Sequence, residues 1–252
     1  MNEATSGPAR KPAALPVRPR TQRVIPIVSP LFVPHERLAR PHDWTVEFGR
    51  TAPLALEIGC GTGHFVVQLA RQQPETDFLA IDIYNKGCLK SCRKLEAADL
   101  TNVRVLRIEA RELLVNAIAP DTLAAIYINC PDPWPKQRHR ERRLVNREFL
   151  AFALRRLRPG GAFFFSSDQR DYVEEVATAL TATPGFSNRL AAPFVEELPG
   201  YPLSKYMRRF LDQGLPVHFI NHRRDPELPL AELPAPNLQS GYRSRRPRGT
   251  HG

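Results

Sequence analysis

The sequence predicts an α/β protein built on a doubly wound, mostly parallel sheet of seven strands. Short apolar runs alternate with amphipathic segments of helical length, which is typical of strands alternating with covering helices. A glycine-rich turn, residues 59–63, joins the first apolar run to the first amphipathic segment. The chain has 252 residues, 42% of them hydrophobic, which is enough for one such domain but not for two large ones. We assign this domain to residues 24–224.

The individual elements follow from the spacing of apolar residues. Strands are predicted at 54–58, 78–82, 103–108, 123–129 and 162–166, with weaker strands near 188–194 and 216–221. Helices are predicted at 64–73, 86–98, 145–157 and 170–180. The run Pro159-Gly160-Gly161 is expected to separate the third helix from the fifth strand.

Positive charge is concentrated in three stretches of a chain whose net charge is +10. Residues 1–23 carry five Lys or Arg against one Glu, residues 136–147 six against one, and residues 223–252 six against three. Residues 1–23 and 225–252 are predicted to be flexible basic tails, and their charge alone is typical of a solvated surface. The internal stripe, 136–147, instead indicates a polyanionic partner such as nucleic acid, because it directly follows a predicted strand.

Several classes of protein are excluded by composition. No apolar run approaches the roughly 20 residues that a membrane helix needs, and the N-terminus lacks the apolar region of a secretory signal. The cysteines form no CxxC pair, and no His/Cys cluster has zinc-ligand spacing. We therefore expect a cytoplasmic protein without a metal, a disulfide or a membrane segment, and no obligate protein partner is evident.

The turn after the first strand, Glu57-Ile58-Gly59-Cys60-Gly61-Thr62-Gly63, is expected to bind a ligand. Its third glycine comes one residue too early for a dinucleotide fingerprint. Glu57 also favours a ligand with a cationic centre over a pyrophosphate. The turn resembles motif I of class I S-adenosylmethionine-dependent methyltransferases, which have a Rossmann-like fold. The resemblance implies S-adenosylmethionine as the cofactor, bound by Glu57, Gly59, Gly61 and Gly63.

Two further acidic residues follow predicted strands. Asp82 ends the second strand, where a carboxylate can accept hydrogen bonds from both hydroxyls of a ribose. Glu109 follows the third strand, where methyltransferases of this class usually have an acidic or amide residue near the adenine. Both residues are therefore expected to bind the cofactor.

The fourth strand runs into a proline-rich loop, Asn129-Cys130-Pro131-Asp132-Pro133-Trp134-Pro135-Lys136, directly before the basic stripe. Because this strand is expected to lie beside the first, the loop is expected to face the reactive end of the cofactor. Its three prolines restrict the backbone, which helps to hold an acceptor atom in line with a methyl group. Trp134 either stacks on a base or wedges the loop, and the sequence leaves both open.

Residues 131–143 resemble the PDPWPKxRHxKRR signature of bacterial tRNA (guanine-N7-)-methyltransferases. Ser166-Ser167-Asp168 resembles the family's A-T-D, and Ser204-Lys205-Tyr206 resembles the start of its T-K-[FY]-E. The resemblance implies methylation of tRNA at N7 of a guanine, namely the variable-loop guanine at position 46. Asp132 would then be the catalytic residue beside the cofactor. The substrate guanosine would be bound by Lys136, Asp168, Ser204, Lys205 and Tyr206, and the RNA backbone by Arg138, Arg140, Arg142 and Arg143.

Met207 departs from the family pattern, which has Glu at this position. A Glu would accept hydrogen bonds from the guanine, whereas Met is expected only to pack against the base, leaving Asp168 to bind it. Met207 is the one feature that favours a non-catalytic RNA-binding protein on a methyltransferase scaffold. A methyltransferase with another nucleic-acid or protein acceptor is a second alternative, because Asn129-Cys130-Pro131 loosely resembles the loop of such enzymes.

Overall fold

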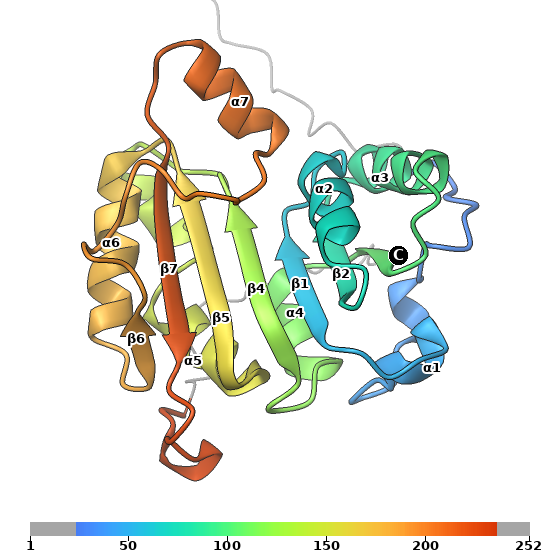
Figure 1. Cartoon of the computed structure of the whole chain (residues 1–252), viewed down its shortest axis with the longest axis horizontal. Helices are drawn as coiled ribbons and strands as arrows, with labels where there is room; N and C mark the ends of the chain where they lie inside the picture. Colours follow the sequence, from blue (N-terminus) through green and yellow to red (C-terminus); the bar gives the residue numbers. More distant parts are fainter. Residues whose placement is uncertain (1–23, 236–252) are drawn as a thin grey trace, which may run out of the picture.

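A seven-stranded sheet with helices on both faces forms the centre of the computed structural model, which describes residues 24–235 (Figure 1). The strands are β1 (Leu54–Ile58), β2 (Asp77–Asp82), β3 (Val103–Arg107), β4 (Leu123–Asn129), β5 (Leu157–Ser167), β6 (Phe186–Asn188) and β7 (His218–Arg224). The α-helices are α1 (Trp44–Phe48), α2 (His64–Gln72), α3 (Asn85–Ala97), α4 (Ala110–Asn116), α5 (Arg147–Arg156), α6 (Arg170–Thr181) and α7 (Lys205–Asp212). Three 3-10 helices complete the described part: η1 (His35–Arg37), η2 (Gln137–Arg142) and η3 (Leu230–Glu232).

The strand order in the sheet is β3-β2-β1-β4-β5-β7-β6. Neighbouring strands from β3 to β5 are parallel, and β7 is antiparallel to both β5 and β6. The prediction of a doubly wound, mostly parallel, seven-stranded sheet is confirmed. The winding changes direction between β1 and β4, and ligands of such sheets bind at the carboxyl ends of strands at this point.

Different helices cover the two faces of the sheet. All five residues of β1 are buried, as expected of a central parallel strand covered on both sides. Leu56 belongs to the apolar cluster beneath α4, α5 and α6, whereas the preceding Ala55 belongs to the cluster beneath α2 and α3. Both clusters form because each helix presents an apolar stripe to the sheet.

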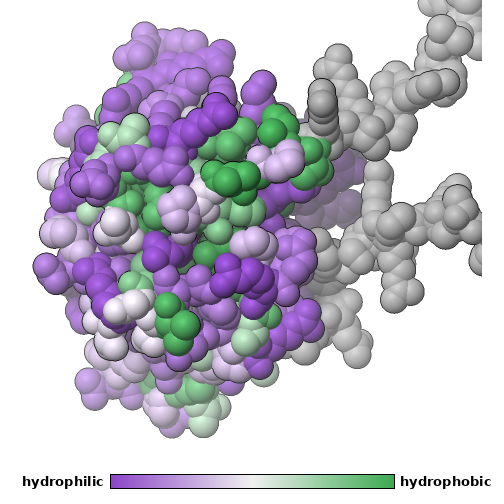
Figure 2. All heavy atoms as spheres, turned by 90° about the vertical axis from the view of Figure 1, so that its right-hand side faces the viewer, coloured by the Kyte–Doolittle hydropathy of each residue, from purple (hydrophilic) through white to green (hydrophobic). Residues whose placement is uncertain are grey.

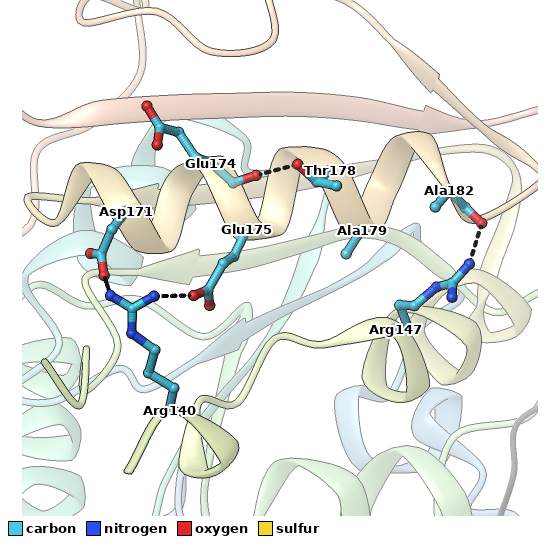
Figure 3. Close-up of a pocket in the computed structure, with 8 residues that line it drawn as sticks. All are labelled: Arg140, Arg147, Asp171, Glu174, Glu175, Thr178, Ala179 and Ala182. Carbon is cyan, nitrogen blue, oxygen red and sulfur yellow. Dashed lines mark hydrogen bonds and ion pairs between the residues drawn. The ribbon is translucent and has the colours of Figure 1, made fainter. Parts of the chain in front are cut away.

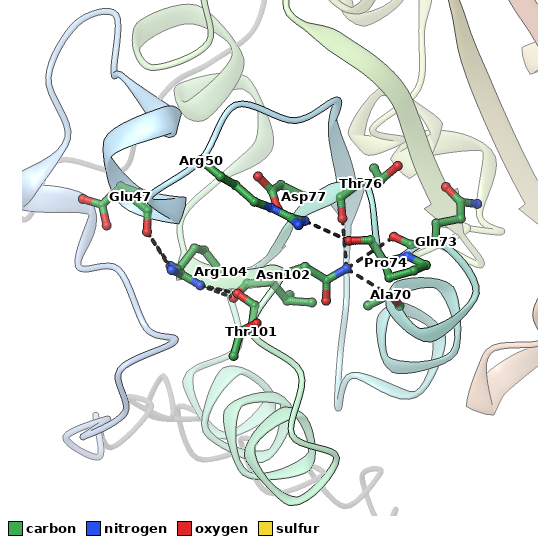
Figure 4. A network of polar contacts seen from close by, with 11 residues as sticks. Glu47, Arg50, Ala70, Gln73, Pro74, Thr76, Asp77, Thr101, Asn102 and Arg104 are labelled. Atoms are coloured by element: carbon green, nitrogen blue, oxygen red, sulfur yellow. Dashed lines mark hydrogen bonds and ion pairs between the residues drawn. The ribbon is translucent and has the colours of Figure 1, made fainter.

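A polar network holds the amino ends of β2 and β3 (Figure 4). The side-chain amide of Asn102 donates to three main-chain carbonyls, those of Ala70, Gln73 and Thr76, at 3.2, 3.4 and 2.9 Å. Arg50 pairs with the buried carboxylate of Asp77 at 2.6 Å. This network fixes the edge of the sheet opposite to the carboxyl ends of the strands.

The boundary between α5 and β5 differs from the prediction. α5 begins at Arg147 and ends at Arg156, so Val145 and Leu157 lie outside it. β5 already begins at Leu157, because this residue pairs with Leu123 on the neighbouring strand. The register then shifts across Pro159-Gly160-Gly161, so these residues form an irregularity within the strand rather than a separating turn. The predicted strand start at 162 was too late.

Three short helices, α1, α4 and α7, were not predicted, because none is long enough to show helical periodicity in the sequence. The sixth strand lies at Phe186–Asn188 rather than near 188–194, while Val195 forms an isolated bridge with Phe219. None of the helices in the described part is long and apolar enough to cross a bilayer.

Residues 225–235 continue to pack on the domain. Leu233 is only 3% exposed, and its carbonyl and that of Leu230 accept hydrogen bonds from Arg155 at 3.2 and 3.0 Å. The prediction of a flexible tail from residue 225 was therefore wrong for these residues, since the segment contributes an apolar side chain to the core. The predicted tail at 1–23 and the remainder, 236–252, lie outside the described residues.

Candidate active site

The turn between β1 and α2 forms the floor of a pocket at the carboxyl ends of the strands. Gly59, Gly61 and Gly63 all have positive φ, so each adopts a conformation that side chains disfavour. The N–H of Gly61 donates to Oδ2 of Asp82 at 2.8 Å, and Oδ1 of Asp82 accepts from the N–H of Tyr84 at the same distance. Asp82 therefore holds the turn against the end of β2 and keeps unused acceptor capacity on both carboxylate oxygens.

The pocket brings together several residues that the sequence predicted to bind ligands. Its lining combines the end of β1, the following turn, the end of β4 and the beginning of α7. Predicted residues in the lining are Glu57, Gly59, Gly61, Ser204, Lys205 and Tyr206. Lining residues that the sequence analysis did not predict as ligand-binding are Cys60, Thr62, His64, Phe65, Tyr84 and Asn129.

Glu57 is a buried carboxyl group with an unsatisfied oxygen. It is 2% exposed, and Oε2 has no hydrogen-bond partner. Burial, followed by the charge of Asp82, raises the pKa of Glu57 to about 8. Such a group is stabilised by a positively charged ligand that satisfies Oε2 and restores the ionised form.

Asn129 supplies the complementary donor. Its Oδ1 accepts hydrogen bonds from the hydroxyls of Ser166 at 3.1 Å and Tyr201 at 2.8 Å. These two donors fix the amide so that Nδ2 is the free group, and Nδ2 is buried without a partner. The pocket thus contains one unsatisfied acceptor, on Glu57, and one unsatisfied donor, on Asn129.

Six residues predicted to bind the cofactor or the substrate lie outside the pocket lining, and two of them, Gly63 and Asp82, belong to the turn and to the strand end that hydrogen-bonds to it. Asp132 and Lys136 are exposed in the loop after β4. Asp168, at the end of β5, accepts a hydrogen bond from Gln169 at 2.6 Å. Glu109 caps α4 by accepting from the N–H groups of the second and third helical residues, Arg111 at 2.8 Å and Glu112 at 3.0 Å. Glu109, Asp132 and Asp168 follow the carboxyl ends of β3, β4 and β5, and the sequence analysis did not predict the capping role of Glu109.

The basic stripe is divided between exposed and buried arginines. Arg138 and Arg142 are exposed. Arg140 donates to Asp171 at 2.5 Å and to Glu175 at 2.8 Å, both on α6 (Figure 3). Arg140, which the sequence analysis predicted to contact the RNA backbone, is therefore already paired with two acids.

Arg143 is part of the core rather than of the surface. It is 2% exposed and pairs with the same two acids, Asp171 at 2.9 Å and Glu175 at 2.7 Å. Its Nε also donates to the carbonyl of Pro133 at 2.8 Å, and its guanidinium lies 4.5 Å above the ring of Tyr172. The prediction that Arg143 contacts the RNA backbone was therefore wrong, because the side chain is enclosed between the proline-rich loop and α6.

Trp134 is held by its own loop. The guanidinium of Arg142 lies 5.0 Å from the centre of its ring, and the ring of His139 meets it edge-on at 5.9 Å. The side chain is half-buried. Of the two interpretations left open, this arrangement favours the wedge.

The start of α7 explains the unusual Met207. Ser204 caps the helix by accepting from the N–H of Met207 at 3.2 Å, and the sulfur of Met207 accepts from the N–H of Ser204 at 3.2 Å. Met207 is 0% exposed and packs with Val217 and Phe219. The expectation that Met207 packs against the substrate base was wrong, because its side chain points into the core beneath the helix.

The described residues contain no group of three or more His, Cys, Asp or Glu placed to hold a metal ion. All four cysteines are unpaired.

Comparison with known proteins gives consistent matches. Residues 51–220 match the model of the family described as "Putative methyltransferase". The chain is 56% identical over 225 residues to a tRNA (guanine-N(7)-)-methyltransferase of Syntrophotalea carbinolica, covering 89% of this chain and 97% of the relative. It is 50% identical over 207 residues to the protein of that name from Geobacter metallireducens, covering 82% of this chain and 98% of the relative.

Among solved structures, the 16S rRNA methyltransferase KamB is similar with a TM-score of 0.56 and 18% identity, covering 77% of this chain and 99% of that one. At this identity the likeness shows the fold alone, which is that of class I methyltransferases.

Proposed function

The chain belongs to the tRNA (guanine-N(7)-)-methyltransferase family, and on this premise we propose that it transfers a methyl group from S-adenosylmethionine to N7 of a guanine in tRNA. The observation that carries the proposal is that one pocket contains an unsatisfied donor, on Asn129, and an unsatisfied acceptor, on Glu57. The chain also matches such an enzyme over nearly its full length.

The pocket fits the amino-acid end of the cofactor. The unsatisfied Oε2 of Glu57 suits an ammonium group, and the unsatisfied Nδ2 of Asn129 suits a carboxylate. The cofactor, when bound, supplies a methyl group on a positively charged sulfur. Glu57 and Asp82 contribute negative charge to this part of the molecule, which favours binding of a cationic cofactor.

The nucleoside end of the cofactor fits the end of β2. Asp82 has acceptor capacity left for the hydroxyls of a ribose. The next residues, Ile83 and Tyr84, are 66% and 45% exposed. Figure 2, which faces the right-hand side of Figure 1, shows apolar patches within a mostly hydrophilic surface. Exposed apolar side chains beside a ribose-binding carboxylate suit the face of an adenine ring.

The acceptor requires positioning rather than a general base. The N7 lone pair of guanine is already nucleophilic, so no proton has to be removed before transfer. Positive charge develops on the guanine ring during transfer, and Asp132 and Asp168 at neighbouring strand ends can stabilise it. Lys136, Ser204, Lys205 and Tyr206 are proposed to orient the guanosine, three of them from the pocket lining.

Within the tRNA, the proposed acceptor is the variable-loop guanine at position 46, as the family resemblance implies. Exposed Arg138 and Arg142 supply positive charge for the RNA backbone near the pocket. We also propose a cytoplasmic location, which agrees with four unpaired thiols.

Nucleoside analysis by mass spectrometry tests the proposal. Unmodified tRNA incubated with the protein and S-adenosylmethionine should gain 7-methylguanosine, and chain cleavage at the modified base should map it to position 46. A methylated product other than 7-methylguanosine would contradict the acceptor atom, and cleavage elsewhere would contradict only the position. The non-catalytic alternative has lost its support, because Met207 lies in the core.

A further inference from the structure

Four basic side chains from three helices meet at the outer edge of the pocket. His64 is the first residue of α2, Lys94 lies in the last turn of α3, and Lys205 and Arg208 lie in the first turns of α7. His64 and Lys205 also line the pocket itself. We call these four residues the cationic rim.

Short contacts connect three of the four residues of the cationic rim, one of them through Gln68. Nζ of Lys94 lies 2.9 Å from Nδ1 and 2.7 Å from Nε2 of His64. Arg208 donates to Oε1 of Gln68 at 2.6 Å, and the amide nitrogen of Gln68 donates to the carbonyls of His64 and Leu203 at 2.7 and 3.0 Å. Gln68 thus connects the start of α2 to the segment that leads into α7.

The positive charge of the cationic rim is not balanced by carboxylates. Within residues 24–235, no ion pair joins Lys94, Lys205 or Arg208 to an acid. Burial, followed by the charges of its three partners in the rim, lowers the pKa of His64. Burial, followed by the charge of Lys205, also lowers the pKa of Lys94. Like charges held this close are stabilised by a bound anion.

The backbone adds to the attraction for an anion. α2 begins directly after the glycine turn, and no side chain caps its N-terminus. Its first N–H groups and the positive end of its dipole lie next to His64, so they act in the same direction as the side chains.

We propose that the cationic rim binds a backbone phosphate of the tRNA, beside the nucleotide that enters the pocket. The inference rests on the proposed function, since it names the part of the substrate that this edge recognises. The cofactor's carboxylate is a less suitable ligand, because Asn129 already offers it a donor inside the pocket. Lys205 and Arg208 are moreover exposed on the outer side, where a polymer can reach them.

Salt-dependent binding of tRNA tests the proposal. Lys94→Ala and Arg208→Ala should each lower the log–log slope of affinity against salt by about 0.7 to 0.9, the change expected for one lost phosphate contact. Arg93→Ala is the matched control, because it removes the same charge from an exposed neighbouring position on α3. This control should keep the wild-type slope, and all three variants should bind S-adenosylmethionine as the wild type does.

A second measurement uses tRNA in which a phosphate flanking the methylated guanine is replaced by a neutral methylphosphonate. This change should weaken binding of the wild type but not of the Lys94→Ala, Arg208→Ala double variant. Unchanged slopes in the variants would overturn the proposal, as would weaker cofactor binding with an unchanged tRNA slope. Wild-type protein that forms no 7-methylguanosine would instead contradict the proposed function, while the slopes still decide whether the rim binds phosphate.

Discussion

At the scale of single residues, Met207 shows that a departure from the family's sequence pattern can have a structural explanation. Its sulfur accepts the hydrogen bond from Ser204 that completes the cap of α7, and its side chain fills the cluster with Val217 and Phe219. The family's Glu stands at the third position after a Ser or Thr, which is the spacing of a capping box. Met at this position therefore preserves the cap while increasing the apolar character of the core.

We predict that Met207→Ala lowers the free energy of unfolding by about 2–5 kcal/mol, because it opens a cavity beneath α7. Met207→Leu keeps the volume and should lower it by less than about 1.5 kcal/mol. Urea denaturation measures both effects. A variant with normal stability but impaired guanine binding would place this side chain at the substrate instead of in the core.

Glu57 gives a prediction for the pH dependence of stability. Its pKa in the folded protein is about 8, above the ordinary value of 4.5, so between these values the folded state binds more protons than the unfolded state. Stability should therefore fall as pH rises through this window, with a slope of up to about 1.4 kcal/mol per pH unit from this group.

Glu57→Gln should remove this contribution, flatten the profile of stability between about pH 5 and 8, and weaken cofactor binding. Thermal unfolding across this range checks the first effect, with exposed Glu75→Gln as a control that keeps the wild-type profile. Equal profiles for Glu57→Gln and the wild type would show that Glu57 is ionised in the free protein.

At the scale of elements, Arg143 fixes the proline-rich loop to α6. Arg143→Ala removes a buried guanidinium that bonds to the Pro133 carbonyl, while Asp171 and Glu175 are about two-fifths exposed and keep Arg140 as a partner. The substitution should therefore cost about 1–3 kcal/mol of stability, which is less than the loss of one member of a fully buried ion pair. Arg138→Ala removes the same charge from an exposed position of the same stripe. It should leave stability unchanged and reduce the salt dependence of tRNA binding. Lost stability in Arg138→Ala, together with reduced salt dependence of tRNA binding in Arg143→Ala, would contradict these two roles.

Tyr201 connects the segment before α7 with the end of β4. Its hydroxyl is one of two donors that orient the amide of Asn129, so Tyr201→Phe should weaken S-adenosylmethionine binding by about fivefold, equal to one hydrogen bond of about 1 kcal/mol. Ser166→Ala removes the other donor and should act in the same direction. Calorimetric titration measures both. Unchanged affinity in both variants would show that the amide orientation does not depend on them.

The elements also show which parts of the fold and of the site can be predicted from the sequence. β1, β2 and β4 were predicted within one residue of their observed bounds, because long apolar runs between turns are specific signals. Glu57 and Asp82 were placed correctly at strand ends for the same reason. The free donor of Asn129 depends on Tyr201, 72 positions away, and the burial of Arg143 depends on α6. No local pattern encodes such contacts.

At the scale of the whole molecule, the first residues that the structure describes lie close to the pocket. The main-chain N–H and carbonyl of Ile25 are bonded to the side chain of Asn85 at 2.8 and 3.1 Å. Asn85 is the first residue of α3 and directly follows Tyr84, which lines the pocket. Ile25 therefore lies close to the pocket lining, and the preceding residues 1–23 carry five Lys or Arg against one Glu.

We predict that deletion of residues 1–23 raises the KM for tRNA at moderate salt and leaves kcat nearly unchanged. The segment adds positive charge that attracts the RNA, but the pocket residues that position the reacting groups all belong to residues 57–206. The increase in KM should be largest near 0.05 M salt and diminish as the Debye length shortens from about 10 Å at 0.1 M to about 3 Å at 1 M. Steady-state kinetics at several salt concentrations separates the two parameters, and the matched control replaces the five basic residues of the segment with Gln at full length. If deletion lowers kcat strongly while the Gln variant does not, the segment contributes to the site through its structure rather than through its charge.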